Sequence, residues 1–261
     1  MLSNRPQAKF ALIVLIAVLA LTSDASAAEA AAQAAADDSP FSVELKLGKD
    51  ASSSRFSGVV QVVVIMTILS ILPALLLTMT SFTRIVIVLS FVRRAMSLQQ
   101  MPPNQVVIGL SLFLTIFVMA PTWEKVNASA LQPYLRGEAS QKAALSDGLE
   151  VMRKFMLSHV REKDLALFVS ISKMPRPETA AQIPVHVVIP AFVTSELKTA
   201  FQMGFVIFIP FLVIDMVVAS VLTSMGMFML PPIVISVPFK IVLFVLVDGW
   251  HLVVRSLAMS F

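Results

Sequence analysis

The sequence predicts an all-α fold, that of a polytopic helical membrane protein. Hydrophobic residues make up 57% of its 261 residues and charged residues only 14%, against about 45–50% and about 25% in soluble domains. Four stretches carry little or no charge, at residues 58–80, 106–121, 201–222 and 234–254. Because a helix needs about 20 mostly apolar residues to cross a bilayer, these stretches are the candidate membrane helices.

Composition also excludes several kinds of site. The chain has no cysteine, so it can form neither a disulfide nor a thiolate metal site. It contains no G-x-x-x-x-G-K-[ST] phosphate loop, no H-E-x-x-H and no G-x-S-x-G, the motifs of nucleotide, zinc-protease and hydrolase sites. The net charge of +4 is small and comes without a basic stripe interleaved with aromatic residues, so nucleic acid is not an expected partner. We expect no enzyme activity, no cofactor and no metal.

Residues 1–27 predict a cleavable signal peptide. Arg5 and Lys9 precede an apolar run at residues 10–21, and an Ala-Ser-Ala sequence ends at residue 27. This is the three-part pattern of a secretory signal. The apolar run is too short to cross about 30 Å of hydrocarbon as a helix. The mature N-terminus is therefore expected outside the cytoplasm.

The next segment, residues 28–57, consists largely of Ala, Ser and Asp and has almost no aromatic side chains. Such a composition buries too little surface to offset chain entropy, so we expect a flexible extracytoplasmic lead-in. Residues 58–122 are then expected to hold two membrane helices with a short cytoplasmic-side connection. The first is residues 58–80, where Pro73 predicts a kink unless neighbouring helices absorb it.

The connection, residues 81–105, contains Arg84, Arg93 and Arg94 and no acidic residue. Basic residues in short loops favour the cytoplasmic side, which sets the orientation. Its apolar residues also predict a helix that packs on another element. Residues 106–121 would then lead the chain back outward.

The second half of the chain divides at residue 189. Residues 123–188 bring mixed charges and helical runs such as 150–169, and we expect a small extracytoplasmic helical region there. Residues 189–261 predict a C-terminal membrane hairpin, whose helices at 201–222 and 234–254 are joined by a tight loop around Pro231-Pro232.

Ionisable residues lie inside this hairpin, at Asp215, Lys240, Asp248 and His251. Each charged one would cost about 2.5–3.5 kcal/mol at a bilayer centre, so each must face protein or water. One hypothesis is a proton relay in a small transporter. The favoured alternative is interhelical pairing of Lys240, with Asp215 or with Glu196. Asp248 and His251, three residues apart, are expected on one helix face.

The loop between the two hairpin helices is rich in methionine, in the sequence Met225-Gly226-Met227-Phe228-Met229. Methionine is unbranched and adaptable, which suits a surface that closes around changing contents. In a single chain these side chains would fill irregular packing. In a ring of chains the same loops would converge into an apolar constriction.

Five sequence blocks together resemble the FliP family of flagellar export proteins and its type III secretion SctR relatives. They are MTSFTRIVIVLSFVRRAM, QQMPPNQV, IPAFVTSELKTAFQMGF, IFIPFLVIDMVVASVL and VPFKIVLFVLVDGW. The resemblance covers residues 59–261. It implies a core subunit of the flagellar type III protein export gate, needed for flagellum assembly, in the bacterial inner membrane at the flagellar basal body.

The same resemblance implies partners and an assembly. Five copies would combine with FliQ and FliR, as helical hairpins in a pseudo-hexameric pore complex, and work with FlhA, FlhB and unfolded export substrates. Some apparent spans would then face protein instead of lipid. Carried onto this chain, the pore gasket corresponds to Met227, Phe228 and Met229. Charges that link neighbouring subunits correspond to Arg161, Glu196 and Lys240, while Asp215 and Asp248 remain as intramembrane polar residues.

Overall fold

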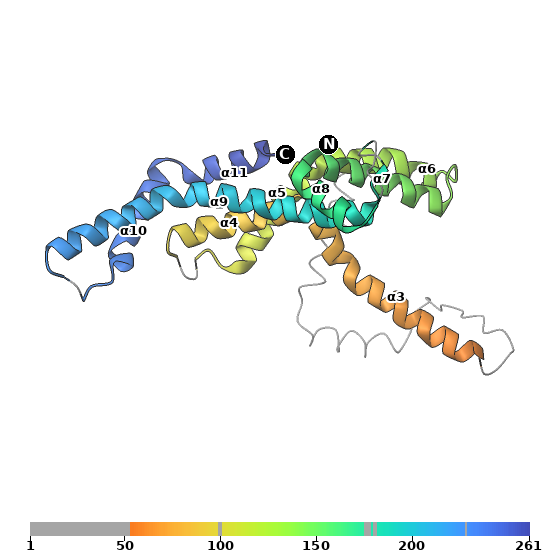
Figure 1. The fold of residues 1–261 in the computed structure, drawn as a ribbon, viewed down its shortest axis with the longest axis horizontal. Helices are drawn as coiled ribbons and strands as arrows, with labels where there is room; N and C mark the ends of the chain where they lie inside the picture. The colour runs from red at the N-terminus through yellow and green to blue at the C-terminus, as the bar shows by residue number, and fades with distance from the viewer. Residues whose placement is uncertain (1–52, 99–100, 175–178, 180–181, 228) are drawn as a thin grey trace, which may run out of the picture. The chain divides into compact units, whose positions relative to one another are not determined.

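The computed structural model describes residues 53–98, 101–174, 179, 182–227 and 229–261. The predicted signal peptide and most of the predicted lead-in lie outside this part of the chain. All regular structure within it is helical, as the sequence predicts (Figure 1). The chain divides into two compact units at residues 75 and 76, and every contact discussed below lies within residues 76–261.

The described helices follow one another with short connections. In chain order they are α3 (Ser53–Thr78), α4 (Phe82–Ala95), α5 (Asn104–Val126), the π-helix η1 (Asn127–Leu131), α6 (Gln132–Leu135), α7 (Gln141–His159), α8 (Glu162–Ile171), α9 (Val185–Ser224), α10 (Pro232–Leu246) and α11 (Gly249–Met259).

Two of the described helices are long and apolar enough to cross a membrane. One runs over Asn104–Leu135 through α5, η1 and α6, and the other is α9. Two broken pairs, Leu69–Thr78 with Phe82–Ala95 and α10 with α11, raise the number to four if each pair forms one span. The chain is thus an all-α polytopic membrane protein.

Helix α9 is much longer than the predicted span at 201–222. It has 40 residues and contains Pro190 and Pro210 in its interior. At about 1.5 Å per residue it is about 60 Å long, twice the roughly 30 Å hydrocarbon thickness of a bilayer. Its first half is buried against other helices of the chain, whereas most side chains of its second half are exposed. Only part of α9 can therefore be membrane-embedded.

The predicted helix at 234–254 is broken, which corrects the placement of Asp248 and His251 on one helix face. Helices α10 and α11 meet at a bend of 63°, and Asp248 lies between them with φ 52° and ψ 51°, in the left-handed region. A side chain at Gly249 would place its Cβ only 2.2 Å from the Phe244 ring. The bend thus depends on a residue without a Cβ, beside one that tolerates the left-handed conformation.

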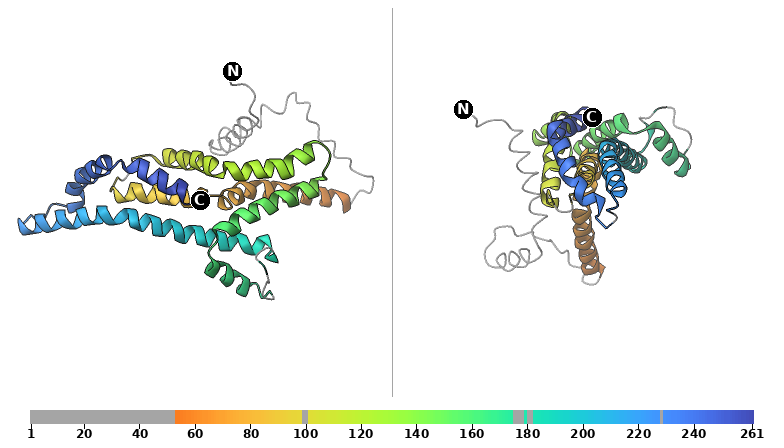
Figure 2. Two further views of the ribbon diagram at one scale, coloured as in Figure 1. Left: turned by 90° about the horizontal axis from the view of Figure 1, so that it is seen from above. Right: turned by 90° about the vertical axis from the view of Figure 1, so that its left-hand side faces the viewer.

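Helix α4 is the centre of the first hydrophobic core. Its buried apolar residues recur at helical spacing, at Ile85, Val88, Leu89 and Val92. They pack with buried residues of α9, α10 and α11, which are Ala200, Phe211, Phe244, Val253 and Leu257. Figures 1 and 2 show α4 running alongside α9. The prediction that residues 82–96 form a packed helix is confirmed.

A second core joins α5, α7 and the start of α9. Its buried members are mostly flexible thioethers and branched aliphatic residues, together with one phenylalanine. They are Met79, Met119, Met152, Met156, Ile183, Val187, Val188 and Phe192. Because unbranched methionine fills irregular gaps, this core can join helices that cross at different angles.

Helices α4 and α9 approach each other closely at Gly204. A Cβ there would lie 2.6 Å from the Phe91 ring and 3.1 Å from its Cβ. We expect Gly204→Ala to lower the free energy of unfolding by about 1–3 kcal/mol, because the added methyl overpacks the contact. Gly109→Ala is the matched control, since no atom lies within 4 Å of a Cβ built there. That helix-interior change should be neutral or add up to about 1 kcal/mol.

Helix content measured during unfolding in detergent checks both variants. The second substitution Phe91→Ala should restore part of the stability lost in Gly204→Ala. Equal stability of the two glycine variants would contradict the packing described here.

Candidate functional site

The methionine loop is fixed at its start by the end of α9. Gly226 has φ +76°, and its N–H donates to the Thr223 carbonyl at 3.0 Å, while the Met227 N–H donates to the Leu222 carbonyl at 3.0 Å. This pair of bonds is the Schellman motif, which ends a helix and turns the chain away from its axis. Pro231 and Pro232 then open α10, because proline lacks the N–H that a helix start leaves unbonded anyway.

The loop presents its thioethers outward. Met229 is 97% exposed and Met225 is also exposed, whereas Met227 is half-buried. Phe228 lies outside the described residues. The side chains of Met225 and Met229 therefore do not fill packing within this chain, which was the alternative for a single chain. Their apolar surface is available for lipid, another copy or another protein.

Lys240 forms a buried polar network just beyond this loop. Its Nζ donates to Asp215 Oδ2 at 2.6 Å and to Ser97 Oγ at 2.7 Å, and Ser236 Oγ donates to Asp215 Oδ1. Lys240 is 1% exposed. The network ties α9 to α10 and to the end of α4. Of the two partners considered for Lys240, the structure pairs it with Asp215.

Glu196 pairs with Arg84. The carboxylate is completely buried and accepts from Arg84 Nε at 2.8 Å and from Arg84 Nη2. This two-bond arrangement is the strongest form of the arginine–carboxylate contact. Arg84 was predicted only as one of three arginines that set orientation. A lone cation within the apolar run of residues 82–92 is the sequence signal that points to its buried role.

Arg161 and Asp248 are the two remaining candidates, and neither belongs to the two buried ion pairs. Arg161 precedes α8, and its backbone N–H donates to Ser195 Oγ at 3.0 Å, which in turn donates to Asp164 Oδ2 at 2.8 Å. Its Nη1 is buried and has no hydrogen-bond partner among the described residues. Asp248 lies at the bend between α10 and α11, and the bonds of the Lys240 network do not include it.

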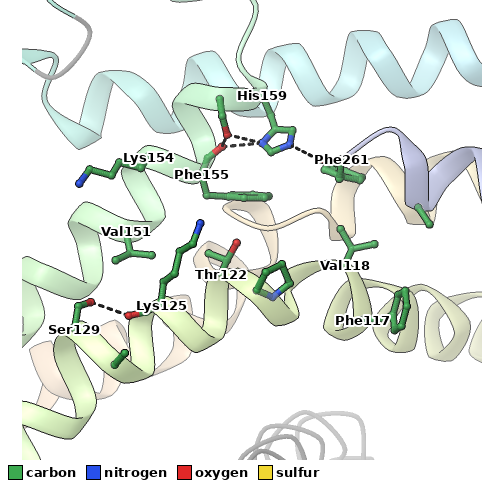
Figure 3. A pocket seen from close by; sticks show the side chains of 14 residues that line it. Phe117, Val118, Thr122, Lys125, Ser129, Val151, Lys154, Phe155, His159 and Phe261 are labelled. Atoms are coloured by element: carbon green, nitrogen blue, oxygen red, sulfur yellow. Dashed lines mark hydrogen bonds between the residues drawn. The ribbon is translucent and has the colours of Figure 1, made fainter.

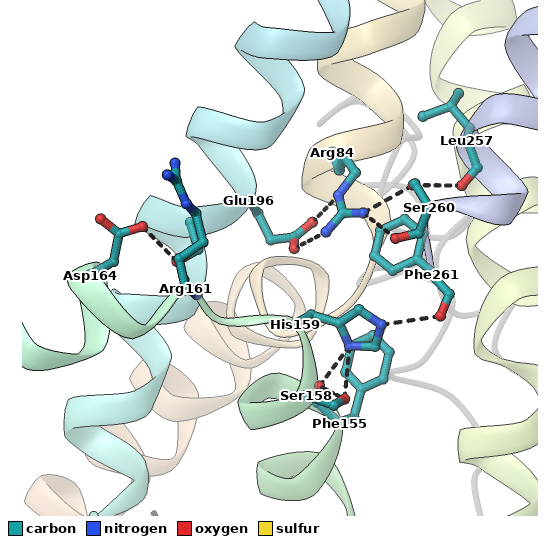
Figure 4. Close-up of polar contacts among 11 residues, drawn as sticks. Arg84, Phe155, Ser158, His159, Arg161, Asp164, Glu196, Leu257, Ser260 and Phe261 are labelled. Carbon is teal, nitrogen blue, oxygen red and sulfur yellow. Dashed lines mark hydrogen bonds and ion pairs between the residues drawn. The ribbon is translucent and has the colours of Figure 1, made fainter.

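Figure 4 shows how the chain's last residues join the Arg84 pair. Arg84 Nη1 donates to the Ser260 carbonyl at 2.7 Å and to Ser260 Oγ at 2.9 Å. Its guanidinium carbon lies 3.8 Å from the centroid of the Phe261 ring, within the range of a cation–π contact. Sequence reasoning did not assign a role to Ser260 or Phe261.

A trough of about 920 Å³ lies between α5, α7 and the end of the chain (Figure 3). Phe117, Val118 and Phe261 give it apolar walls, and Lys125 and Lys154 contribute two ammonium groups. None of its lining residues is acidic.

Near this trough, Glu150 lies beside Arg153 and 3.9 Å from the Lys154 Nζ. The hydrogen bond from Arg153 lowers the pKa of Glu150, and burial offsets part of that effect. His159 Nδ1 lies 3.0 Å from Ser158 Oγ. Within the described part of the chain, no cluster of three or more His, Asp or Glu side chains could hold a metal ion.

Comparison with known proteins identifies one family. The sequence model of the FliP family matches residues 65–257. The flagellar biosynthetic protein FliP of Bacillus subtilis (strain 168) is 58% identical over 205 residues, which cover 78% of this chain and 93% of that protein. FliP of Caulobacter vibrioides is 53% identical over 84% of this chain and 82% of the relative. FliP of Aquifex aeolicus (strain VF5) is 49% identical over 84% of this chain and 91% of the relative.

The buried pair gives a stability prediction. Glu196→Gln leaves the Arg84 cation buried without a counter-charge, which should cost about 3–5 kcal/mol of unfolding free energy. Glu138→Gln is the control, since Glu138 is exposed, and it should change stability by less than about 0.5 kcal/mol. Thermal unfolding of the purified protein in detergent compares the two. An unchanged melting temperature for Glu196→Gln would show that the pair contributes no stability.

Proposed function

This chain belongs to the FliP family, and on that premise we propose that it is a core subunit of the flagellar type III protein export gate. In this role it forms, with FliQ and FliR, the channel through which unfolded flagellar subunits cross the inner membrane during flagellum assembly. The family match supports the coarser statement, a flagellar biosynthesis protein of the type III export apparatus. The finer statement rests on the geometry of the methionine loop.

The observation that carries the proposal is the outward exposure of this loop. A Schellman turn and two prolines fix its ends, and Met229 is 97% exposed between them. A loop held at both ends but unpacked within its own chain can close only against something else. Five such loops around one axis would make an apolar seal, formed by Met227, Phe228 and Met229, that yields to a passing polypeptide.

The surface of the α9–α10 hairpin supports assembly. Exposed apolar side chains occupy several sides of both helices. They include Phe205, Val206, Met216 and Val217 on α9 and Phe239, Val242 and Val245 on α10. Soluble monomers rarely expose contiguous apolar patches of more than a few hundred Å², so lipid or partner helices must cover this hairpin. We propose FliQ, FliR and four further copies of this chain as the protein part of that cover, with FlhA and FlhB beyond it.

Glu196 and Lys240 do not bond a neighbouring subunit directly in this proposal; the residues around them make that contact. Each is paired within its own chain, with Arg84 and Asp215 respectively. Arg161 is only half-buried, whereas Glu196 and Lys240 are fully buried, which favours Arg161 among the three as a donor to a neighbour. The proposed location is the inner membrane, with several crossings, at the flagellar basal body.

Removal of the methionine loop should abolish closure of the pore without preventing assembly of the complex. We expect deletion of residues 227–229 to raise the permeability of the membrane to small ions, because an apolar constriction is lost, while the complex still assembles. Met216→Ala is the control, since it removes an exposed methionine of α9 outside the loop. Ion leak through cells expressing each variant measures the effect. A membrane as tight after the deletion as before it would contradict the gasket assignment.

Subunit composition tests the assembly itself. Native mass spectrometry of the tagged chain, extracted gently after co-expression with the neighbouring export genes, should show about five copies together with two smaller membrane proteins. That expectation comes from the proposed function and is independent of the loop's permeability. A lone monomer or dimer would contradict the gate and favour the small-transporter alternative.

A further inference from the structure

The last two residues of the chain are held by two different helices. Arg84 of α4 bonds the Ser260 carbonyl and hydroxyl and lies over the Phe261 ring. His159, the final residue of α7, places its Nε2 3.3 Å from the Phe261 carbonyl oxygen and its ring 5.4 Å from the Phe261 ring. Figure 4 shows Phe261 between these two side chains. A single aromatic residue thus joins α4, α7 and the end of α11.

His159 is itself held in place. Its Nδ1 lies 2.8 Å from the Phe155 carbonyl oxygen in the preceding turn, and its ring packs 4.6 Å from the Phe155 ring. The Phe155 ring in turn contacts Phe192 of α9 at 6.0 Å. The site that receives Phe261 is therefore linked through Phe155 to Phe192, a buried residue of the second core.

Helix α11 has few other attachments. The 63° bend at Asp248 turns α11 out of line with α10, and the views show it running back from that bend to end near α5 and α7. Only Gly249, Val253 and Leu257 of α11 are buried. A stripe of one residue per turn holds a short helix weakly. The terminal contacts with Arg84 and His159 are therefore a large share of what fixes its end.

We propose that Ser260 and Phe261 form a clasp that holds α11 in its resting position. Helix α10 has its own anchor, because Lys240 is bonded to Asp215 and Ser97. Release of Phe261 from the site formed by Arg84 and His159 would therefore free α11, and not α10, to move about the bend at Asp248. The meaning of this motion for a gate rests on the proposed function, whereas the clasp itself does not.

Release is physically accessible without unfolding. Arg84 would keep both bonds to Glu196, through Nε and Nη2, and would lose the Nη1 bonds to Ser260 and the contact with the Phe261 ring. Ser260 and Phe261 are half-buried, so their departure opens no sealed cavity. Phe261 also lines the trough beside α5 and α7, which offers space into which its ring can move.

The absence of cysteine from the chain makes paired spin labels a clean test. One pair, Lys154→Cys on α7 with Leu252→Cys on α11, measures the clasped helix, and both side chains are exposed. A second pair, Lys154→Cys with Val206→Cys, measures α7 against α9, which contains no part of α11. Labelled chains are diluted with unlabelled cysteine-free chains, so that distances between copies do not contribute. The clasp variant is Phe261→Ala, and Met259→Ala, exposed at the end of α11, is its matched control.

Phe261→Ala should convert the single narrow 154–252 distance into a broad distribution and leave the 154–206 distance unchanged. Met259→Ala should leave both distances unchanged, and Phe261→Tyr, which keeps an aromatic face over Arg84, should restore the narrow distance. A 154–252 distance that stays narrow in Phe261→Ala would overturn the clasp. Broadening of both distances would also overturn it, since Phe261 would then be part of the general core. Neither result depends on ion leak or subunit composition, which test the gate separately.

Discussion

The buried ion pair between Arg84 and Glu196 is the interaction on which the rest of the structure depends. It lies between α4 and α9, where the two helices run together and the two hydrophobic cores adjoin. Apolar packing alone would allow α4 to slide or rotate on α9, because aliphatic surfaces are tolerant of small shifts. Two directed bonds to a buried carboxylate fix the register. They also leave one guanidinium nitrogen free to hold Ser260.

Sequence reasoning found the elements whose signal is local. The packed helix within the 81–105 connection was predicted from its apolar residues, and a partner for Lys240 was expected because an unpaired charge in that segment is costly. The role of Arg84 was missed because an arginine near a membrane helix has two explanations, topology and pairing. Only the position of Glu196, 112 residues away, decides between them, and no local pattern encodes that distance.

The predicted span at 201–222 lies within α9, and its apolar composition does not predict that the helix begins as early as Val185. Helix α9 continues through Pro190 and Pro210, because neighbouring helices and side chains can satisfy the backbone groups that proline frees in membrane helices. Conversely, the bend at Asp248 was missed within an apolar run, although Asp-Gly is a turn sequence. Tertiary contact, here the Phe244 ring against Gly249, decides which of these weak signals takes effect. The exposure of the loop methionines could not be predicted from the sequence either, because it depends on the whole fold.

Because α9 is continuous, a small tilt of the helix at one point moves its far end by a larger distance. The helix runs without interruption from Glu196, clamped against Arg84, to Ser224, where the methionine loop begins. The 28 residue steps from 196 to 224 span about 42 Å at about 1.5 Å per residue. By that geometry a tilt of about 5° at the clamped point displaces the far end by about 4 Å, roughly the width of a methionine side chain. A tilt too small to break the contacts of Glu196 is therefore large enough to change which methionine side chains meet at the loop.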